Sequence, residues 1–170
     1  MAESGRIILD VSSTNYISGY IEWSEGDVSI KDNTSVVTAS LVYVHKGSVN
    51  TGNNSSDFYL TINGSKVERK NGYTLHPGNT YKVLTHSVTV EHAPDGSKSI
   101  TIEGGGGING TTGLSDSHGS GTVVLTTIHR TVRVNADGTW ERAVPWVNDE
   151  GTWKRSVPFV NKEGTWHHSV

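Results

Sequence analysis

The residues best suited to chemistry in this sequence are five aromatic side chains near its C-terminal end. A side chain with an apolar ring and a polar edge can stack on a sugar ring or pack against another protein chain. This segment offers few aliphatic residues from which to build a core, so we expect its rings to serve as core or intersubunit packing. Stacking on a glycan is the alternative. The five residues are Trp140, Trp146, Trp153, Phe159 and Trp166.

Catalytic groups are harder to find. Ser115-Asp116-Ser117-His118 contains the three residue types of a hydrolase triad. A triad, however, takes its members from separate elements and holds its base with a buried partner. We expect a solvated loop there instead. No acidic residue has a sequence context that suggests burial, as one of the paired carboxylates of a glycosidase would need. The sequence therefore predicts no catalytic residue and no enzyme.

Phosphate and metal sites are also poorly supported. The run Gly104-Gly105-Gly106-Gly107 is not followed by Lys-Ser/Thr or by the start of a helix, so we expect a flexible connection between two strands and no phosphate cradle. The histidines lack the paired spacing of a zinc site. His129 and His167-His168 could meet a metal only if three chains converged on an axis. We predict no cofactor and no metal ligand within one chain.

The composition narrows the class of protein. The 170 residues carry 14 basic and 17 acidic side chains, a net charge of −3 that argues against a nucleic-acid partner. The sequence contains no Cys, which excludes a disulfide scaffold and a thiolate metal site. We find no pattern of a signal peptide or of a membrane span, so export by a standard N-terminal signal is not expected.

The elements that must position these residues are β-strands. Over residues 1–128, apolar and polar residues alternate in segment after segment, with turn residues between them, and helical periodicity is missing. We expect about eight strands at spacings suited to a sandwich. Alternation of this kind is typical of antiparallel sheets with one wet face, so an immunoglobulin-like antiparallel β-sandwich is the preferred architecture. A Greek-key barrel is the second choice.

Individual strands and turns can be placed from the pattern. We expect strands over residues 7–11 and 17–23, the second ending in a turn at residues 24–27. Asn63-Gly64 is the strongest short hairpin signal. The segment 92–96 should connect a strand carrying Val88 and Val90 to one carrying Ile100 and Ile102, with these two pairs facing each other. Further inward-facing residues are Val37, Ala39, Leu41, Tyr43, Phe58, Leu60, Ile62, Val123 and Leu125.

Two further features could line a binding surface. Tyr43, Tyr59, Tyr73 and Tyr81 could form a sugar groove or could simply fit the half-buried pleat of a sheet. Residues 48–56 are rich in Ser and Asn, and we expect a long exposed loop there, where binding variation tends to be carried.

Residues 129–170 form a second region, a repeat with a period of thirteen residues. Because Asn-x-Asp/Glu-Gly is turn chemistry, we predict three short β-hairpins in which each Trp folds back beside the Val that precedes the turn. Pro145 and Pro158 each remove a ladder donor and should keep the hairpins separate. The repeat units centre on Gly138-Thr139-Trp140, Gly151-Thr152-Trp153 and Gly164-Thr165-Trp166.

Residues 88–100, the closing segment 121–130 and the Val-Pro-aromatic-Val-Asn…Gly-Thr-Trp repeat carry a resemblance to a known family. Together they resemble minor structural proteins of long-tailed bacteriophages that infect Gram-positive bacteria, in which similar Trp-containing repeats close many tail and baseplate proteins. The resemblance implies a place in the virion, with synthesis in the cytoplasm of the bacterial host. The length of this chain fits a compact accessory or decoration subunit better than a whole tail fibre.

Three functions follow as expectations. The first is a virion structural protein, tail-associated or decorating, that self-associates and docks non-covalently on other phage proteins through its repeats, with host-surface adhesion as an added role. The second is a carbohydrate-binding module that recognises host cell-wall glycan by aromatic stacking. The third, an accessory domain of a secreted hydrolase, conflicts with the missing signal peptide.

Overall fold

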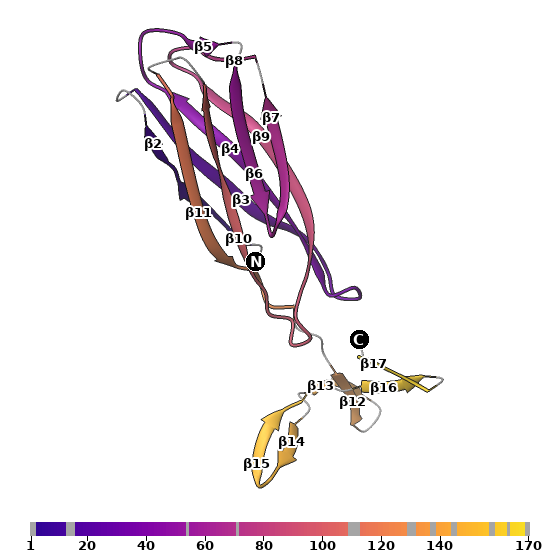
Figure 1. Ribbon diagram of the computed structural model, residues 1–170. Helices are drawn as coiled ribbons and strands as arrows, with labels where there is room; N and C mark the ends of the chain where they lie inside the picture. Colours follow the sequence, from indigo (N-terminus) through magenta and orange to yellow (C-terminus); the bar gives the residue numbers. More distant parts are fainter. Residues whose placement is uncertain are drawn as a thin grey trace.

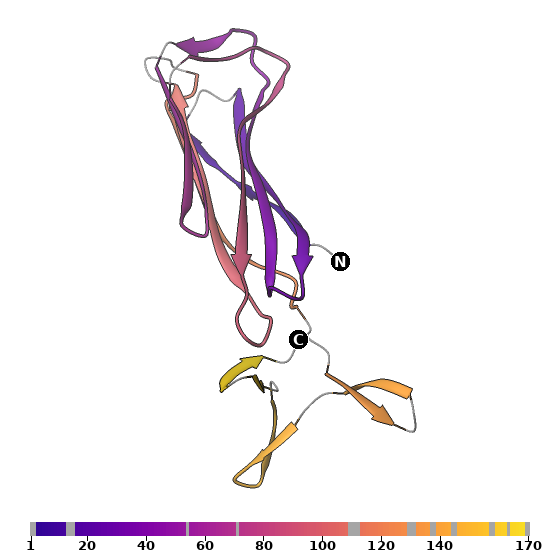
Figure 2. The ribbon, with the colours of Figure 1, turned by 90° about the vertical axis from the view of Figure 1, so that its right-hand side faces the viewer.

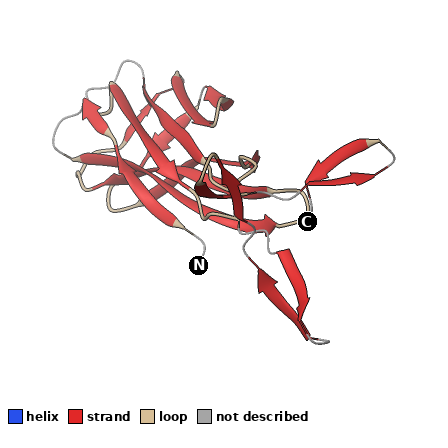
Figure 3. Ribbon diagram, turned by 90° about the horizontal axis from the view of Figure 1, so that it is seen from below, coloured by secondary structure: helices blue, strands red, loops and turns tan. Residues whose placement is uncertain are grey.

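The computed structural model shows a protein made of β-strands and connecting segments, without helix in the part of the chain that it describes (Figure 3). The structure describes residues 3–12, 16–53, 55–70, 72–108, 113–128, 132–136, 139–143, 146–156, 159–162 and 164–168, and for 52–53, 132–143, 159–162 and 165–168 it describes the backbone alone. Every strand pair is antiparallel. The all-β prediction is confirmed.

Two antiparallel sheets make up the larger part of the molecule, and Figures 1 and 2 show them as two layers. The four-stranded sheet contains, in order, β1 (Ser4–Ile8), β3 (Ile17–Ser29), β4 (Thr34–His45) and β9 (Thr80–Glu91). The five-stranded sheet contains, in order, β2 (Asp10–Ser12), β11 (Asp116–Val124), β10 (Ser99–Ile108), β6 (Ser56–Ile62) and β7 (Ser65–Lys70).

The core lies between these sheets and is built from alternate residues of each strand. Side chains with less than 2% exposure come from both sheets, including Leu41 and Tyr43 of β4 and Phe58 and Leu60 of β6. Burying one Leu, Ile or Phe side chain contributes about 1.5–3 kcal/mol, so these alternating faces hold the layers together. The predicted inward-facing residues are confirmed.

The strand order differs from that of an immunoglobulin domain. The first long strands, β3 and β4, pair directly in one sheet. When β1 and β2 are counted together as the first strand, β3 and β4 are the second and third strands, which lie in different sheets of an immunoglobulin domain. The segment after β9 also crosses between sheets, since β9 pairs with β4 whereas β10 pairs with β6 and β11. Residues Val88 and Val90 therefore lie in the opposite layer from Ile100 and Ile102.

The hairpin predicted at Asn63-Gly64 is confirmed. Both residues have positive φ, 48° and 82°, as a two-residue turn of the mirror-image type requires. β6 and β7 pair on either side, with Ile62 opposite Ser65.

The turn predicted at residues 24–27 is wrong. β3 continues to Ser29, and two of its residues, Gly26 and Asp27, lie opposite the single residue Val36 of β4, which is a β-bulge. The chain reverses later, over residues 30–33, where Asn33 has a φ of 59°. Gly26 and Asp27 are turn-forming residue types, but a bulge uses the same residues without ending the strand.

The flexible connection predicted at residues 104–107 is also wrong. The glycine run is the second half of β10, which lies between β6 and β11 and pairs with both. At Gly106, φ is 120°, and a Cβ there would overlap the carbonyl oxygen of Asp57. The neighbouring backbones approach too closely for any side chain, so glycine serves packing at this site.

The exposed loop predicted at residues 48–56 is only partly correct. Part of it forms β5 (Thr51–Asn53), which pairs with β8 (Tyr73–Leu75) in a small sheet at one end of the sandwich (Figure 1). Thr51 and Ser56 are buried, whereas Ser48 and Val49 are exposed.

Candidate functional site

After Ile128, the described chain forms three two-stranded antiparallel sheets, one in each thirteen-residue unit (Figure 1). Each sheet is too small to enclose a core of its own. The strands are β12 (Val132–Ala136) with β13 (Thr139–Ala143), β14 (Trp146–Asp149) with β15 (Thr152–Arg155), and β16 (Phe159–Lys162) with β17 (Thr165–His168).

The register places each Trp opposite an Asn. The pairs are Asn135 with Trp140, Asn148 with Trp153 and Asn161 with Trp166. Neighbouring strand residues belong to opposite faces, so the Val that precedes each Asn lies on the other face from the Trp. The prediction that Trp folds back beside that Val is therefore wrong.

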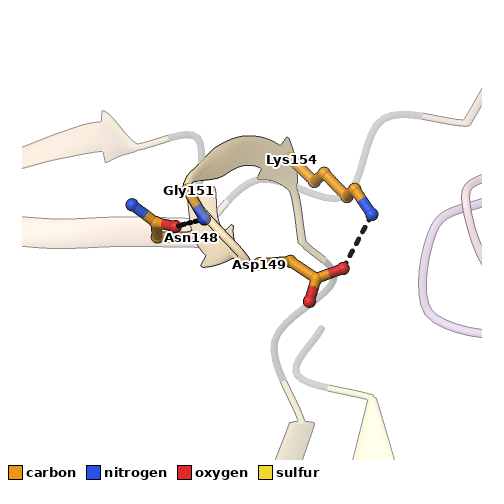
Figure 4. Close-up of polar contacts among 4 residues, drawn as sticks. All are labelled: Asn148, Asp149, Gly151 and Lys154. Carbon is orange, nitrogen blue, oxygen red and sulfur yellow. Dashed lines mark hydrogen bonds and ion pairs between the residues drawn. The ribbon is translucent and has the colours of Figure 1, made fainter.

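The turn of the β14–β15 hairpin shows why the sequence reverses there. Glu150 and Gly151 have φ values of 49° and 83°, and the Gly151 N–H donates a hydrogen bond to Asn148 Oδ1 at 2.8 Å (Figure 4). Glycine adopts such a φ without strain, and the Asn side chain replaces a backbone acceptor. The prediction that Asn and Gly make this turn is confirmed here.

The aromatic side chains of this hairpin are open to solvent. Trp146 is 54% exposed and Trp153 is 65% exposed. The register puts them on one face together with Arg155, whose guanidinium carbon lies 5.9 Å from the centre of the Trp146 ring. The opposite face carries Lys154, which forms a 2.7 Å ion pair with Asp149 (Figure 4).

Of the five predicted contact residues, then, Trp146 and Trp153 lie on one face of one hairpin and are not buried within the chain. A role for them as an internal core is excluded, whereas an intersubunit or glycan contact stays a prediction. Trp140, Phe159 and Trp166 lie in described strands, but their side chains are outside the described residues.

The predicted loop around residues 115–118 is wrong, because β11 begins at Asp116. Ser117 points into the core, where its Oγ lies 2.5 Å from Tyr43 Oη and donates to the Gly106 carbonyl at 2.6 Å. His118 lies on the outer face and contacts Tyr59 Oη at 2.8 Å. Alternation along the strand therefore sends Ser117 and His118 to opposite sides of the sheet, so they cannot act together.

The sandwich buries one carboxylate that the sequence did not reveal. Glu25, at the bulge of β3, is only 3% exposed. Its Oε1 accepts a hydrogen bond from Ser35 Oγ at 2.8 Å, and its Oε2 accepts one from the Thr126 N–H at 3.0 Å. Burial raises the pKa of Glu25, but hydrogen bonds from Thr126 and Ser35 outweigh it and hold the pKa below its ordinary value.

This cluster continues to an imidazole. Ser35 Oγ lies 2.8 Å from His92 Nε2, and His92 Nδ1 donates to the Gly96 carbonyl at 2.9 Å. The three side chains of Glu25, Ser35 and His92 are between 0% and 5% exposed, so no substrate can reach them. The Gly96 carbonyl also accepts from the Ile128 N–H at 2.9 Å. We interpret the cluster as a set of contacts that holds residues 125–128 on the sandwich. The hairpins follow these residues in the chain.

The tyrosines do not share a groove. Tyr43 is buried, and burial raises its pKa. Its ring is 5.5 Å from that of Phe58, which in turn contacts Tyr73, and Tyr73 contacts Tyr81. These tyrosines form an aromatic row on the inner side of the sheets, whereas Tyr59 lies on the outer side.

A hollow of about 440 Å³ lies on the outer face of the four-stranded sheet. Its charged residues are Arg6, Glu22 and Lys82. Glu22 and Lys82 form an ion pair at 2.6 Å, and the Arg6 guanidinium carbon stacks 4.4 Å from the centre of the Tyr20 ring. Its charges are thus largely engaged with the protein itself.

Metal ligands do not gather in the part of the chain that the structure describes: it holds no group of three His, Asp or Glu side chains suited to an ion. His129 and the side chains of His167 and His168 lie outside the described residues. Among the described residues, none belongs to a helix long and apolar enough to cross a membrane.

Comparison of the chain with protein-family models, with curated proteins and with solved structures found no match.

Proposed function

We propose that this chain is a structural subunit of a bacteriophage virion, tail-associated or decorating, in which a two-sheet sandwich of residues 1–128 carries an array of three hairpins, residues 129–170. The observation that supports this most is the exposure of the β14–β15 hairpin. Trp146, Val147 and Trp153 are 54%, 48% and 65% exposed, so both faces of the hairpin carry large apolar side chains that are about half open to solvent. Such surfaces are typical of contacts with another protein or ligand.

The mechanism is non-covalent. Neighbouring copies, or other virion proteins, cover the hairpin faces and the open sheet edges, which also removes the aggregation hazard of unpaired strands. The sequence resemblance to phage minor structural proteins supports the virion as the place of assembly.

Deletion of residues 131–170 tests this function. The core ends with Leu125 and Ile128, so the shortened chain should stay folded and soluble but lose self-association and incorporation into particles. Light scattering gives the mass of both chains. A shortened chain that still assembles like the full chain would rule the function out.

A second function, recognition of a host cell-wall glycan, is favoured by the two exposed rings on one face of the β14–β15 hairpin. Tryptophan supplies a large, rigid, amphipathic surface on which sugar rings can stack. Binding of the full chain to host cell walls that is lost in Trp153→Ala, with assembly unchanged, would support this function over the first.

A further inference from the structure

The strands of the hairpins segregate residue types between their two faces. We call the side that contains Trp140, Trp153 or Trp166 the Trp face. By register, the Trp faces hold Arg133, Asn135, Trp140 and Arg142 in the first hairpin, Trp146, Asn148, Trp153 and Arg155 in the second, and Phe159, Asn161, Trp166 and His168 in the third.

By register, the Trp face is aromatic in every unit and contains Arg in the first two units and His168 in the third, where Lys162 belongs to the other face. In the strand residues that the structure describes, each Trp face carries Arg or His and none carries a carboxylate. The two carboxylates of these strands, Glu141 and Asp149, lie on the face opposite the Trp face. Val134, Val147 and Val160 lie on that opposite face as well. The separation places rings and basic groups together on the Trp face, which suits a ligand with rings and negative charge.

The hairpin with described side chains shows the arrangement directly. Arg155 lies over the Trp146 ring on the Trp face, and no carboxylate in the hairpin's described strands shares that face. The neighbouring cation, Lys154, is held by Asp149 on the other face. The available positive charge of this hairpin is therefore placed beside its exposed rings.

We propose that the Trp faces bind an anionic polysaccharide, with sugar rings stacked on the aromatic side chains and acidic groups paired with Arg or His. This inference rests on the glycan-binding function above and specifies its ligand class. The ligand is a polymer because three equivalent faces follow one another in the chain, and linked sites gain affinity only when one partner can engage several at once.

The test uses the full chain and three polymers that separate ring from charge. Carboxymethyl-dextran has sugar rings and carboxylates, dextran has the rings alone, and poly-L-glutamate has carboxylates without rings. We expect carboxymethyl-dextran to bind at least about tenfold more tightly than either of the others, because only it satisfies both groups at several hairpins. Its affinity should fall as salt is raised, since the ionic contacts are exposed.

Adjacent cations on opposite faces provide a matched pair of variants. Arg155→Gln should weaken binding of carboxymethyl-dextran by about threefold and reduce its salt dependence. Lys154→Gln removes the same charge from the other face and should leave both unchanged. Trp153→Ala should weaken binding by about tenfold, Trp153→Phe should restore most of it because a ring is retained, and Val147→Ala should have little effect.

The outcomes separate this inference from the functions on which it stands. Equal binding of dextran would overturn the anionic ligand class while keeping glycan recognition. Equal binding of poly-L-glutamate would overturn the stacking of sugar rings, and an equal loss in Lys154→Gln would overturn the assigned face. Failure to bind any of the polymers would overturn the inference, whereas the glycan function is judged by binding to host cell walls and the assembly function by light scattering.

Discussion

At the scale of single residues, the most consequential side chain in the sandwich is Glu25. A buried carboxylate is costly unless hydrogen bonds compensate it, and here Ser35 and the Thr126 backbone do so. Because Thr126 lies just before the hairpins in sequence, this one side chain connects the interior of the sandwich to the start of the tail.

Glu25→Gln should destabilise the sandwich by about 1–3 kcal/mol, because an amide cannot accept hydrogen bonds from Ser35 and Thr126 as both carboxylate oxygens do. Urea unfolding followed by circular dichroism gives this value. Glu22→Gln, which removes only a surface ion pair, should change stability by less than about 0.5 kcal/mol. Equal losses in the two variants would contradict the role of the buried site.

The same residue predicts a pH dependence. The pKa of Glu25 in the folded protein lies below its ordinary value of 4.5, so its carboxylate contributes stability above that pH. That contribution is lost as the pH falls through the lower folded pKa. Stability of the original protein should therefore decline more steeply below about pH 4.5 than that of Glu25→Gln. Parallel curves would show that another group controls acid unfolding.

At the scale of elements, β10 is the strand most sensitive to substitution. Its second half runs between β6 and β11 with no room for a Cβ at Gly106. Neither β6 nor β11 can easily move away from β10, because each is held in the sheet by its own backbone hydrogen bonds.

Gly106→Ala should destabilise the protein by roughly 2–4 kcal/mol, from the positive φ and the overlap with the Asp57 carbonyl together. Gly26→Ala is the control, because a Cβ there meets only the Val36 carbonyl oxygen at 3.5 Å. Thermal unfolding of the two variants measures the difference. If Gly106→Ala unfolds at the same temperature as the unsubstituted protein, the close packing described for β10 is incorrect.

The strands and hairpins also show which features of the fold could be predicted from the sequence. Alternation of apolar residues identified the inner faces of β4 and β6, and Asn63-Gly64 located its hairpin, because both signals are local. The glycine run and the bulge at Glu25 depend on which strands become neighbours, which a local pattern does not contain. For the hairpins, the turn residues were predictable from the sequence. The residue opposite each Trp was not, because a shift of one residue in register moves a side chain to the other face of the sheet.

At the scale of the whole molecule, the chain combines a sandwich with its own core and hairpins whose described side chains are exposed. The tail contains four of the five tryptophans, and the fifth, Trp23, is partly buried against the sandwich core. The intrinsic fluorescence of the protein therefore reports mainly on the tail.

Deleting residues 131–170 should shift the emission maximum to shorter wavelength and reduce quenching by acrylamide, because Trp23 is packed whereas Trp146 and Trp153 are more than half exposed. The measurement is made at a concentration at which light scattering finds single chains. An unchanged spectrum would mean that the tail rings are as protected as Trp23.

Each hairpin pairs its two strands within one unit, and among the strands that the structure describes none pairs with a strand of another hairpin. Gain or loss of thirteen residues can therefore change the number of units without disturbing the sheets of the sandwich. The number of exposed hairpins can then evolve by simple duplication or deletion of a short stretch of coding sequence, while the fold of the body remains the same.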